Sequence, residues 1–259
     1  MCTLTLAWRV FADAPVVVAA NRDELLDRES EPPAIRAGDP KFVAPRDAEA
    51  GGTWIGYNEA GVFCGITNRW AEVPGGGERS RGLLVQDVLE TESADEARRV
   101  VESAVEADTY NGFNLVVAER GPAGGNDTTP QAFLLEWDGE LRVRGLEPGV
   151  HVVVVNVGVD GEYFEPDGAP ERGVEQAANA ERVRDVLEPR TSEGVTAWRD
   201  RAIEILADHD FGVCVHDPER RFGTRSSSVV TLFADGTAEF AFADGPPCET
   251  PFRPVESHI

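Results

Sequence analysis

The order of strand-like and helix-like segments restricts the fold of this chain more than any other feature of its sequence. Alternating, β-branched stretches come in consecutive pairs joined by short turns, at 3–21, 50–70 and 224–245. Helical spacing appears in only two blocks, 83–107 and 177–208, and Ser93 is a candidate N-cap for the second helix of the first block. Because strands and helices do not alternate regularly, antiparallel hairpins in stacked sheets with helices outside fit better than a doubly wound fold. The sequence therefore predicts the α+β class.

Two further features bear on how the chain is organised. The stretch 25–50 is rich in proline and charge, which predicts an irregular surface excursion. The 259 residues contain no internal repeat and no linker-like segment. We therefore predict a single domain that spans residues 1–259.

The formal net charge of -23 is unusually negative, and it predicts the environment better than the function. Lys41 is the only lysine, and acidic residues are spread along the whole length. A dispersed acidic surface stays hydrated in concentrated salt, where self-repulsion is screened. The composition therefore predicts a halophilic, acidic protein. No basic stripe is present to neutralise phosphates, which argues against nucleic acid and anionic membranes as partners.

Cysteines and histidines show no spacing typical of a metal site or a disulfide framework. They are Cys2, Cys64, Cys214, Cys248, His151, His209, His216 and His258. The N-terminus lacks the basic and apolar regions of a signal peptide. No run approaches the ~20 apolar residues of a membrane helix. We therefore expect a cytoplasmic protein with no metal, no resident cofactor and no membrane span.

Cys2, directly behind the initiator methionine, has two interpretations. It is either a small apolar core residue, as most free cysteines are, or the first residue after removal of Met1. In the second case one carbon carries a thiol and a free α-amine, which is a nucleophile with its own base. The reference pKa values, about 7.7–8.0 for the amine and about 8.5 for the thiol, allow proton exchange near neutral pH.

The first strand pair should bring four polar residues close to Cys2. Alternation puts Asn21 and Asp23 on one strand face and Arg22 on the other. The Asp23 carboxylate could orient the amine or thiol, or it could simply cap a turn. Arg22 and Glu24 could form a local ion pair, which at a surface contributes only ~0–1 kcal/mol.

Other polar residues lie at strand ends or within strand-like runs. Asparagines at such places supply amide donors to an oxyanion hole, or they satisfy turns. Arg225 could bind a substrate carboxylate in bidentate fashion, or it could pair with a neighbouring acid. The asparagines are Asn68, Asn111, Asn114 and Asn156.

Several motifs, taken in order, resemble the NRDE family, which includes the transport and Golgi organisation proteins of eukaryotes. They are MC at the start, AANRDE, GGTWIG, GITN, SRG, YNGFNL and FGTRSSSVV. The matches run from residue 2 to about residue 240. The resemblance implies a four-layer αββα sandwich, similar to the N-terminal-nucleophile hydrolases that include bile-salt hydrolases and penicillin V acylases.

The same resemblance implies a set of roles. Cys2 corresponds to the nucleophile, Asp23 to its supporting aspartate, Asn68 and Asn156 to the oxyanion asparagines, and Arg225 to a late arginine beside the nucleophile. Substrate binding or support is assigned to Asn21, Arg22, Glu24, Trp54, Asn111 and Asn114. One departure is that the acylases carry an arginine three residues before the aspartate, where this chain has Ala20.

Two functions follow from these observations. The first is a cysteine N-terminal-nucleophile hydrolase that cleaves a non-peptide C–N bond, an amide, of a small molecule. The second is a non-catalytic protein of the same family that binds or carries haem or an acyl metabolite, with the Cys2 thiolate as a possible iron ligand. Neither requires a nucleic acid or a membrane, and the sequence leaves the oligomeric state open.

Overall fold

A computed structural model describes residues 2–121, 130–154 and 157–259. The chain divides into two compact units, each assembled from segments distant in sequence. The first unit comprises Met1–Arg28, Pro148–Thr231 and Glu239–Val255. The second comprises Glu29–Glu147, Leu232–Ala238 and Glu256–Ile259.

The first unit is built on a seven-stranded sheet with the order β10-β1-β2-β14-β15-β16, in which β13 also pairs with β14. The strands are β1 (Thr3–Trp8), β2 (Val16–Leu25), β10 (Gly149–Val154), β13 (His216–Asp217), β14 (Phe222–Leu232), β15 (Ala238–Ala243) and β16 (Arg253–Pro254). The short strands β11 (Gly158–Val159) and β12 (Glu162–Tyr163) form a separate ribbon.

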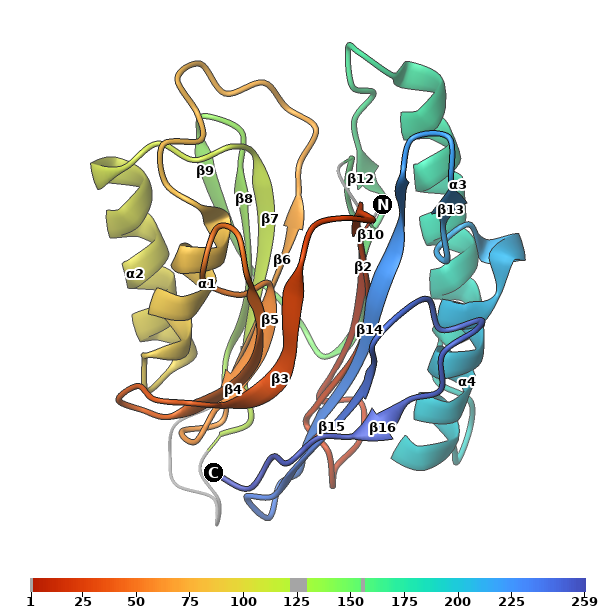
Figure 1. Cartoon of the computed structure of the whole chain (residues 1–259). Coiled ribbons are helices and arrows are strands. Elements are labelled where there is room, and N and C mark those ends of the chain that lie inside the picture. The colour runs from red at the N-terminus through yellow and green to blue at the C-terminus, as the bar shows by residue number, and fades with distance from the viewer. Residues whose placement is uncertain (1, 122–129, 155–156) are drawn as a thin grey trace. The chain divides into compact units, whose positions relative to one another are not determined.

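Two helices pack on this sheet, α3 (Pro170–Leu187) against β10 and α4 (Val195–Ala207) against β2 (Figure 1). Helix α3 begins earlier than its apolar spacing predicts, because Pro170 occupies its first turn, where a missing N–H costs nothing. A short 3-10 helix, η1 (His209–Phe211), follows α4. Trp198 of α4 stacks edge-on against Phe11, with ring centroids 6.1 Å apart.

The strands β1 and β2 form the antiparallel hairpin that the sequence predicts, with Thr3 opposite Asn21. Every residue of β1 is buried, where the alternation of residue types predicts only half burial. The reason is that neither face carries a charged side chain. One face presents Leu4 and Leu6 and the other small residues such as Thr5, so both faces can be buried.

The second unit contains a seven-stranded antiparallel sheet whose strands follow one another in chain order. The strands are β3 (Ser30–Arg36), β4 (Phe42–Asp47), β5 (Ile55–Asn58), β6 (Val62–Asn68), β7 (Phe113–Glu119), β8 (Ala132–Trp137) and β9 (Leu141–Gly145). The helices α1 (Arg81–Leu89) and α2 (Ala94–Ala107) pack on it (Figure 1). Ser93 caps α2 as predicted, because its side chain accepts a hydrogen bond from the Glu96 N–H.

The prediction of an irregular excursion at 25–50 is wrong, because β3 and β4 lie there. Strand β3 is the edge of its sheet and is mostly exposed. Prolines are tolerated at such an edge, and the register shifts between Glu31 and Ala34, around Pro32 and Pro33. The prolines and charges therefore mark an edge strand here, not a loop.

The GGTW and SRG motifs meet in the second unit. Gly52 has a φ of +70°, and a Cβ added there would lie 2.2 Å from the Gly82 carbonyl carbon. The Thr53 N–H donates a hydrogen bond of 2.9 Å to the Gly82 oxygen. Only glycine fits this close approach of two backbones. These motif residues therefore hold the start of α1 in place.

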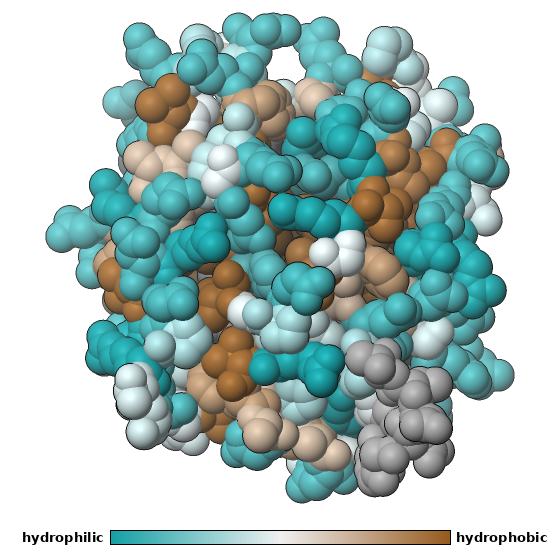
Figure 2. Space-filling view, turned by 180° about the vertical axis from the view of Figure 1, so that it is seen from behind, coloured by the Kyte–Doolittle hydropathy of each residue, from teal (hydrophilic) through white to brown (hydrophobic). Residues whose placement is uncertain are grey.

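Both units carry helices on antiparallel sheets, which confirms the predicted α+β class. None of the helices in the described ranges is long and apolar enough to cross a membrane. The face seen in Figure 2 is mostly hydrophilic, and its apolar side chains occur in separate small groups. This surface agrees with the excess of acidic residues in the sequence.

Candidate active site

The thiol of Cys2 lies at the start of β1, in the first unit. The β1–β2 register, continued by one residue beyond Thr3 and Asn21, sets Cys2 opposite Arg22. The Cys2 Sγ lies 3.6 Å from the backbone oxygen of Asp23, to which the thiol donates. The side chain is partly buried. The hairpin therefore brings the NRDE stretch to Cys2, as its pattern predicts.

Asp23 is a buried carboxyl group held from β14. Its side chain is 4% exposed, and the Thr224 hydroxyl donates to Oδ1 over 2.6 Å. Thr224 is itself fixed, because its Oγ1 accepts a hydrogen bond of 2.9 Å from the Val215 N–H. Burial raises the pKa of Asp23, while the Thr224 hydrogen bond and the Arg22 charge oppose that rise. The Asp23 carboxyl group is therefore buried and held in place by Thr224.

Asn21 supports the site without offering a free group to a ligand. Its Nδ2 donates to the backbone oxygens of Leu206, at 2.9 Å, and Val213, at 2.8 Å. Its Oδ1 accepts from the Ser227 hydroxyl. Both amide hydrogens are therefore used, and the side chain ties β2 to α4, the segment after η1 and β14.

Arg22 lies two residues after Ala20, the position at which the acylases carry an arginine. Arg22 points to the opposite strand face from Asn21. In an antiparallel pair, residues opposite each other share a face. Because the register continued beyond Thr3 and Asn21 sets Cys2 opposite Arg22, these two side chains lie on one face. Arg22 also lies on the same face as Ala20, two residues along the strand. Burial raises the pKa of the Cys2 thiol, and the Arg22 charge acts against that rise. A positive charge is therefore present on this strand face, two residues after the position of the acylase arginine.

The Arg22 side chain is buried, and its negative partner is more exposed. Arg22 is 6% exposed, and its Nη2 lies 4.0 Å from Glu24 Oε2. Glu24 also pairs with Arg28 at 3.6 Å. The predicted ion pair between Arg22 and Glu24 is thus present, at the long limit of such contacts.

Arg225 of β14 retains hydrogen-bonding capacity. Its Nε is buried and has no hydrogen-bond partner among the residues that the structure describes. A buried, unsatisfied cationic donor is costly, so it needs a reason. An anionic or carbonyl group of a ligand would satisfy it.

Four of the other predicted residues, Asn68, Asn111, Asn114 and Trp54, belong to the second unit. Asn68 ends β6 and is exposed, as is Asn111. Trp54 is partly buried, and its backbone oxygen accepts from the Ile66 N–H over 2.9 Å. Asn156 lies outside the described residues. The oxyanion role of Asn68 and Asn156 stays a prediction.

Asn114 is buried within a hydrogen-bonded network of the second sheet. It is 0% exposed, its Nδ2 donates to Thr67 Oγ1 over 3.3 Å, and its Oδ1 accepts from Arg69 over 3.1 Å. Arg69 also binds Glu136 at 2.9 Å and Asp138 at 3.3 Å. This network satisfies both ends of the amide and supports the sheet.

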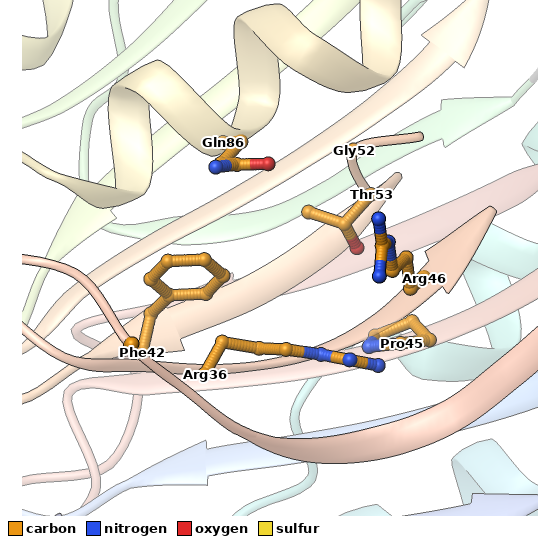
Figure 3. A pocket seen from close by; sticks show the side chains of 8 residues that line it. Arg36, Phe42, Pro45, Arg46, Gly52, Thr53 and Gln86 are labelled. Carbon is orange, nitrogen blue, oxygen red and sulfur yellow. The ribbon is translucent and has the colours of Figure 1, made fainter. Parts of the chain in front are cut away.

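A pocket of ≈ 190 Å³ in the second unit contains none of the predicted site residues. Figure 3 shows Arg36 and Arg46 lining it together with Phe42. Both arginines pair with Glu31, at 2.8 and 3.8 Å. The two guanidinium groups share this one carboxylate, and Arg36 Nη2 is buried with no hydrogen-bond partner among the described residues, so the pocket keeps positive charge.

Comparison with known proteins decides the family. A family model described as Transport and Golgi organisation 2 matches residues 1–162, more than half of the chain. The chain belongs to this family. The human Transport and Golgi organization protein 2 homolog is 32% identical over 114 residues, which are 43% of this chain and 41% of that protein. The bovine homolog is 27% identical over 247 residues, 87% of this chain and 84% of that protein.

Solved structures show the fold of this Transport and Golgi organisation family member. An N-acylethanolamine-hydrolyzing acid amidase ortholog from Caenorhabditis elegans has a TM-score of 0.55 at 13% identity, covering 90% of this chain and 93% of that one. The C2A mutant of conjugated bile acid hydrolase from Clostridium perfringens has a TM-score of 0.54 at 11% identity, covering 94% and 89%. At such identities the likeness shows the fold alone, and it confirms the predicted N-terminal-nucleophile-hydrolase-like fold.

Proposed function

We propose that the protein is a cysteine N-terminal-nucleophile hydrolase that cleaves a non-peptide amide bond of a small molecule after Met1 is removed. The observation that carries the proposal is the position of the Cys2 thiol, 3.6 Å from the Asp23 backbone and opposite Arg22. The similarity in fold to an acid amidase and a conjugated bile acid hydrolase supports it. The structure of the conjugated bile acid hydrolase is that of a variant in which the cysteine at its own position 2 is replaced by alanine.

The chemistry begins with one proton transfer. The α-amine of Cys2 takes the thiol proton, and the thiolate sulfur attacks the carbonyl carbon of the amide. The C–S bond forms as the carbonyl π electrons move to oxygen, which gives a tetrahedral oxyanion. Collapse of this oxyanion expels the amine, which takes the proton from the Cys2 ammonium. Water then attacks the thioester, releases the acid and restores the thiol.

Three residues of the first unit support these steps in the proposal. Asp23, fixed by Thr224, accepts a hydrogen bond from the Cys2 amine and orients it. Arg22 supplies positive charge on the thiolate face, which lowers the thiol pKa against the effect of burial. Arg225 supplies a buried donor to an anionic or carbonyl group of the substrate.

The test is turnover of a panel of acyl amides, measured in high salt, by wild type and Cys2→Ala. We expect Cys2→Ala to lose at least about a thousandfold in kcat/KM, since loss of a nucleophile removes the covalent route. Cys64→Ala is the matched control, because Cys64 is a fully buried thiol of the second unit. Its rate per folded molecule should match wild type. Undiminished turnover in Cys2→Ala would contradict the proposal.

If Met1 stays in place, we expect the alternative function, a protein that binds or carries a small molecule. A retained methionine removes the free amine from Cys2 and with it the proton transfer. A haemin titration that saturates at one equivalent in wild type, but not in Cys2→Ala, would then indicate a Cys2-dependent haem site. Absence of a saturable spectral change would exclude it.

A further inference from the structure

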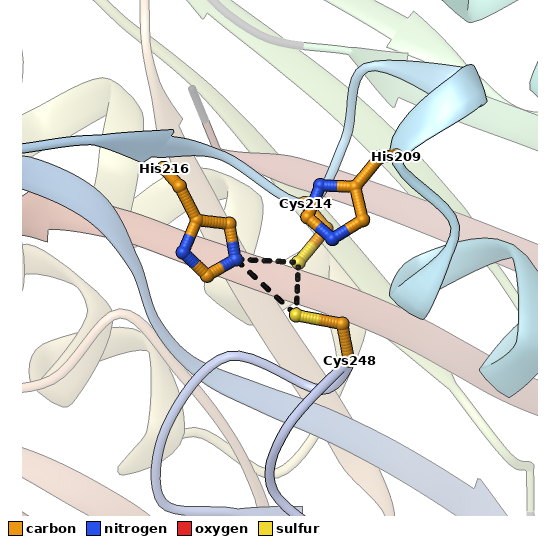
Figure 4. Close-up of side chains that lie close together, drawn as sticks. All are labelled: His209, Cys214, His216 and Cys248. Atoms are coloured by element: carbon orange, nitrogen blue, oxygen red, sulfur yellow. Dashed lines mark hydrogen bonds between the residues drawn. The ribbon is translucent and has the colours of Figure 1, made fainter.

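Four nitrogen and sulfur ligands converge in the first unit, away from Cys2 in sequence. His209 belongs to η1, Cys214 follows it, His216 begins β13, and Cys248 lies in the turn between β15 and β16. Their ligand atoms all lie within 4.8 Å of one another. Figure 4 shows the four side chains pointing toward a common centre. Cys214 is buried, and the histidines are at the surface.

Three of the four ligand atoms are spaced nearly as they would be around a single tetrahedral ion, and the His209 nitrogen lies within 4.8 Å of them. The two sulfurs of Cys214 and Cys248 are 3.5 Å apart. His216 Nε2 lies 3.2 Å from the Cys248 sulfur and 3.8 Å from the Cys214 sulfur. Ligands bound at Zn–S ≈ 2.3 Å and Zn–N ≈ 2.0–2.1 Å with tetrahedral angles lie about 3.4–3.8 Å apart. The group needs only small adjustments to hold an ion.

We propose that His209, Cys214, His216 and Cys248 bind one Zn²⁺ as a closed structural site. Two thiolates and two imidazoles are the ligand set that zinc prefers over harder cations such as Mg²⁺ and Ca²⁺. Four side chains complete a tetrahedral shell and leave no position for a substrate. Binding releases the two thiol protons to solvent.

The backbone around the ligands is already fixed in place. Val215, between Cys214 and His216, bonds on both sides to Thr224: its N–H donates to Oγ1 over 2.9 Å and its oxygen accepts from the Thr224 N–H over 2.8 Å. Gly212 has a φ of +67°, which turns the chain after His209. The Glu249 N–H donates to the Pro246 oxygen over 3.0 Å and closes the turn that holds Cys248.

The zinc has two consequences in this proposal. It joins the β15–β16 turn to the segment after α4, two parts of the chain that are distant in sequence. It also steadies Val215 and through it Thr224, whose hydroxyl donates to Asp23 Oδ1 over 2.6 Å. The metal does not touch substrate, so its ligands are positioning residues for Asp23.

A Cys214–Cys248 disulfide is the competing explanation of the same contact, and it leaves the two histidines without a role. The His216 Nε2, 3.2 Å from the Cys248 sulfur, is a natural zinc ligand and contributes nothing to a disulfide. His209 and His216 also lie with ring centroids 5.1 Å apart, so both reach the same centre.

The test is metal analysis of the full chain, produced without an affinity tag and purified under reducing conditions. We expect about one Zn²⁺ per chain by elemental mass spectrometry. Replacement by Co²⁺ should give thiolate-to-metal charge transfer and the d–d bands of a tetrahedral ion. Cys248→Ser should weaken zinc binding by more than about a hundredfold, since loss of an outer-shell partner alone costs about 10–100-fold.

Two control variants keep this test separate from the proposed hydrolase. His258→Ala removes an exposed histidine outside the cluster, and Cys2→Ala removes the proposed nucleophile. Both should keep one zinc. The site is refuted if reduced wild type binds no stoichiometric Zn²⁺ on titration, or if Cys248→Ser binds it as tightly as wild type. It is also refuted if peptide mapping finds Cys214 and Cys248 joined as a disulfide in protein purified under reducing conditions.

Discussion

Two polar sites, one in each unit, differ in how their buried hydrogen-bonding groups are satisfied. In the second unit, Asn114 donates to Thr67 and accepts from Arg69, which also binds Glu136. In the first unit, Arg225 keeps a buried Nε with no partner among the described residues. A closed network stabilises a sheet, whereas an open donor is available to a ligand.

The largest effect is expected at Asp23. Asp23→Asn should lower kcat on an amide substrate by about 10²–10⁴, the range of a general acid–base contribution, because the amide orients the Cys2 amine less well. Asp27→Asn is the matched control, since Asp27 is 59% exposed and pairs only loosely with Arg221, at 3.7 Å. Equal activity in the two variants would show that Asp23 merely caps the strand.

The next effect concerns stability in the second unit. Asn114→Ala should lower the free energy of unfolding by about 2–4 kcal/mol, because it leaves a cavity and a buried Arg69 donor without an acceptor. Asn111→Ala, at an exposed position, should change it by less than about 0.5 kcal/mol. Denaturant unfolding measures both, and turnover per folded molecule should be unchanged in both. A loss of turnover without loss of stability would place Asn114 in the active site.

A smaller effect is expected at Arg225. Arg225→Gln should raise KM by about 10–100-fold with little change in kcat, since it removes a charge-assisted contact of about 1.5–3 kcal/mol to the bound substrate. Arg221→Gln, at a 70% exposed arginine, is the control. A fall in kcat with unchanged KM would instead assign Arg225 to the transition state.

The smallest effect is a pH dependence of stability. Burial raises the pKa of Asp23 in the folded protein. Such a carboxyl group contributes stability that is fully present below its unfolded pKa of about 3.9 and is lost as pH rises through the folded pKa. Asp23→Asn should therefore be more stable than wild type at pH 7, with the difference shrinking below about pH 4. Thermal unfolding across pH measures it, and a difference that grows on acidification would contradict it.

The sequence predicted the strand pairs and the family well, and the edges of the second sheet poorly. The β1–β2 hairpin and the Ser93 cap depend on local patterns and were confirmed. Strand β3 was not predicted, because its prolines were interpreted as marks of a loop. These prolines lie on an edge strand, where a backbone N–H is not needed for pairing. Edge position is a property of the whole sheet, which local patterning does not contain.

The position of the NRDE stretch beside Cys2 was predictable from the sequence, but its contacts were not. The NRDE stretch lies at Cys2 as expected, yet the partners of Asn21 come from α4 and from the segment after η1, far along the chain. The sequence spacing also did not indicate that His209, Cys214, His216 and Cys248 lie together, because Cys248 is supplied by the β15–β16 turn.

The most direct test of the central claim is the N-terminus of the purified protein, read by intact mass and by sequencing of the N-terminal peptide. We predict a mass one methionine residue below that of the full chain, with Cys2 first. In that state the amine and the thiol share one residue, and the hydrolase chemistry is possible. Retention of Met1 on active protein would contradict the claim that Cys2 is an N-terminal nucleophile.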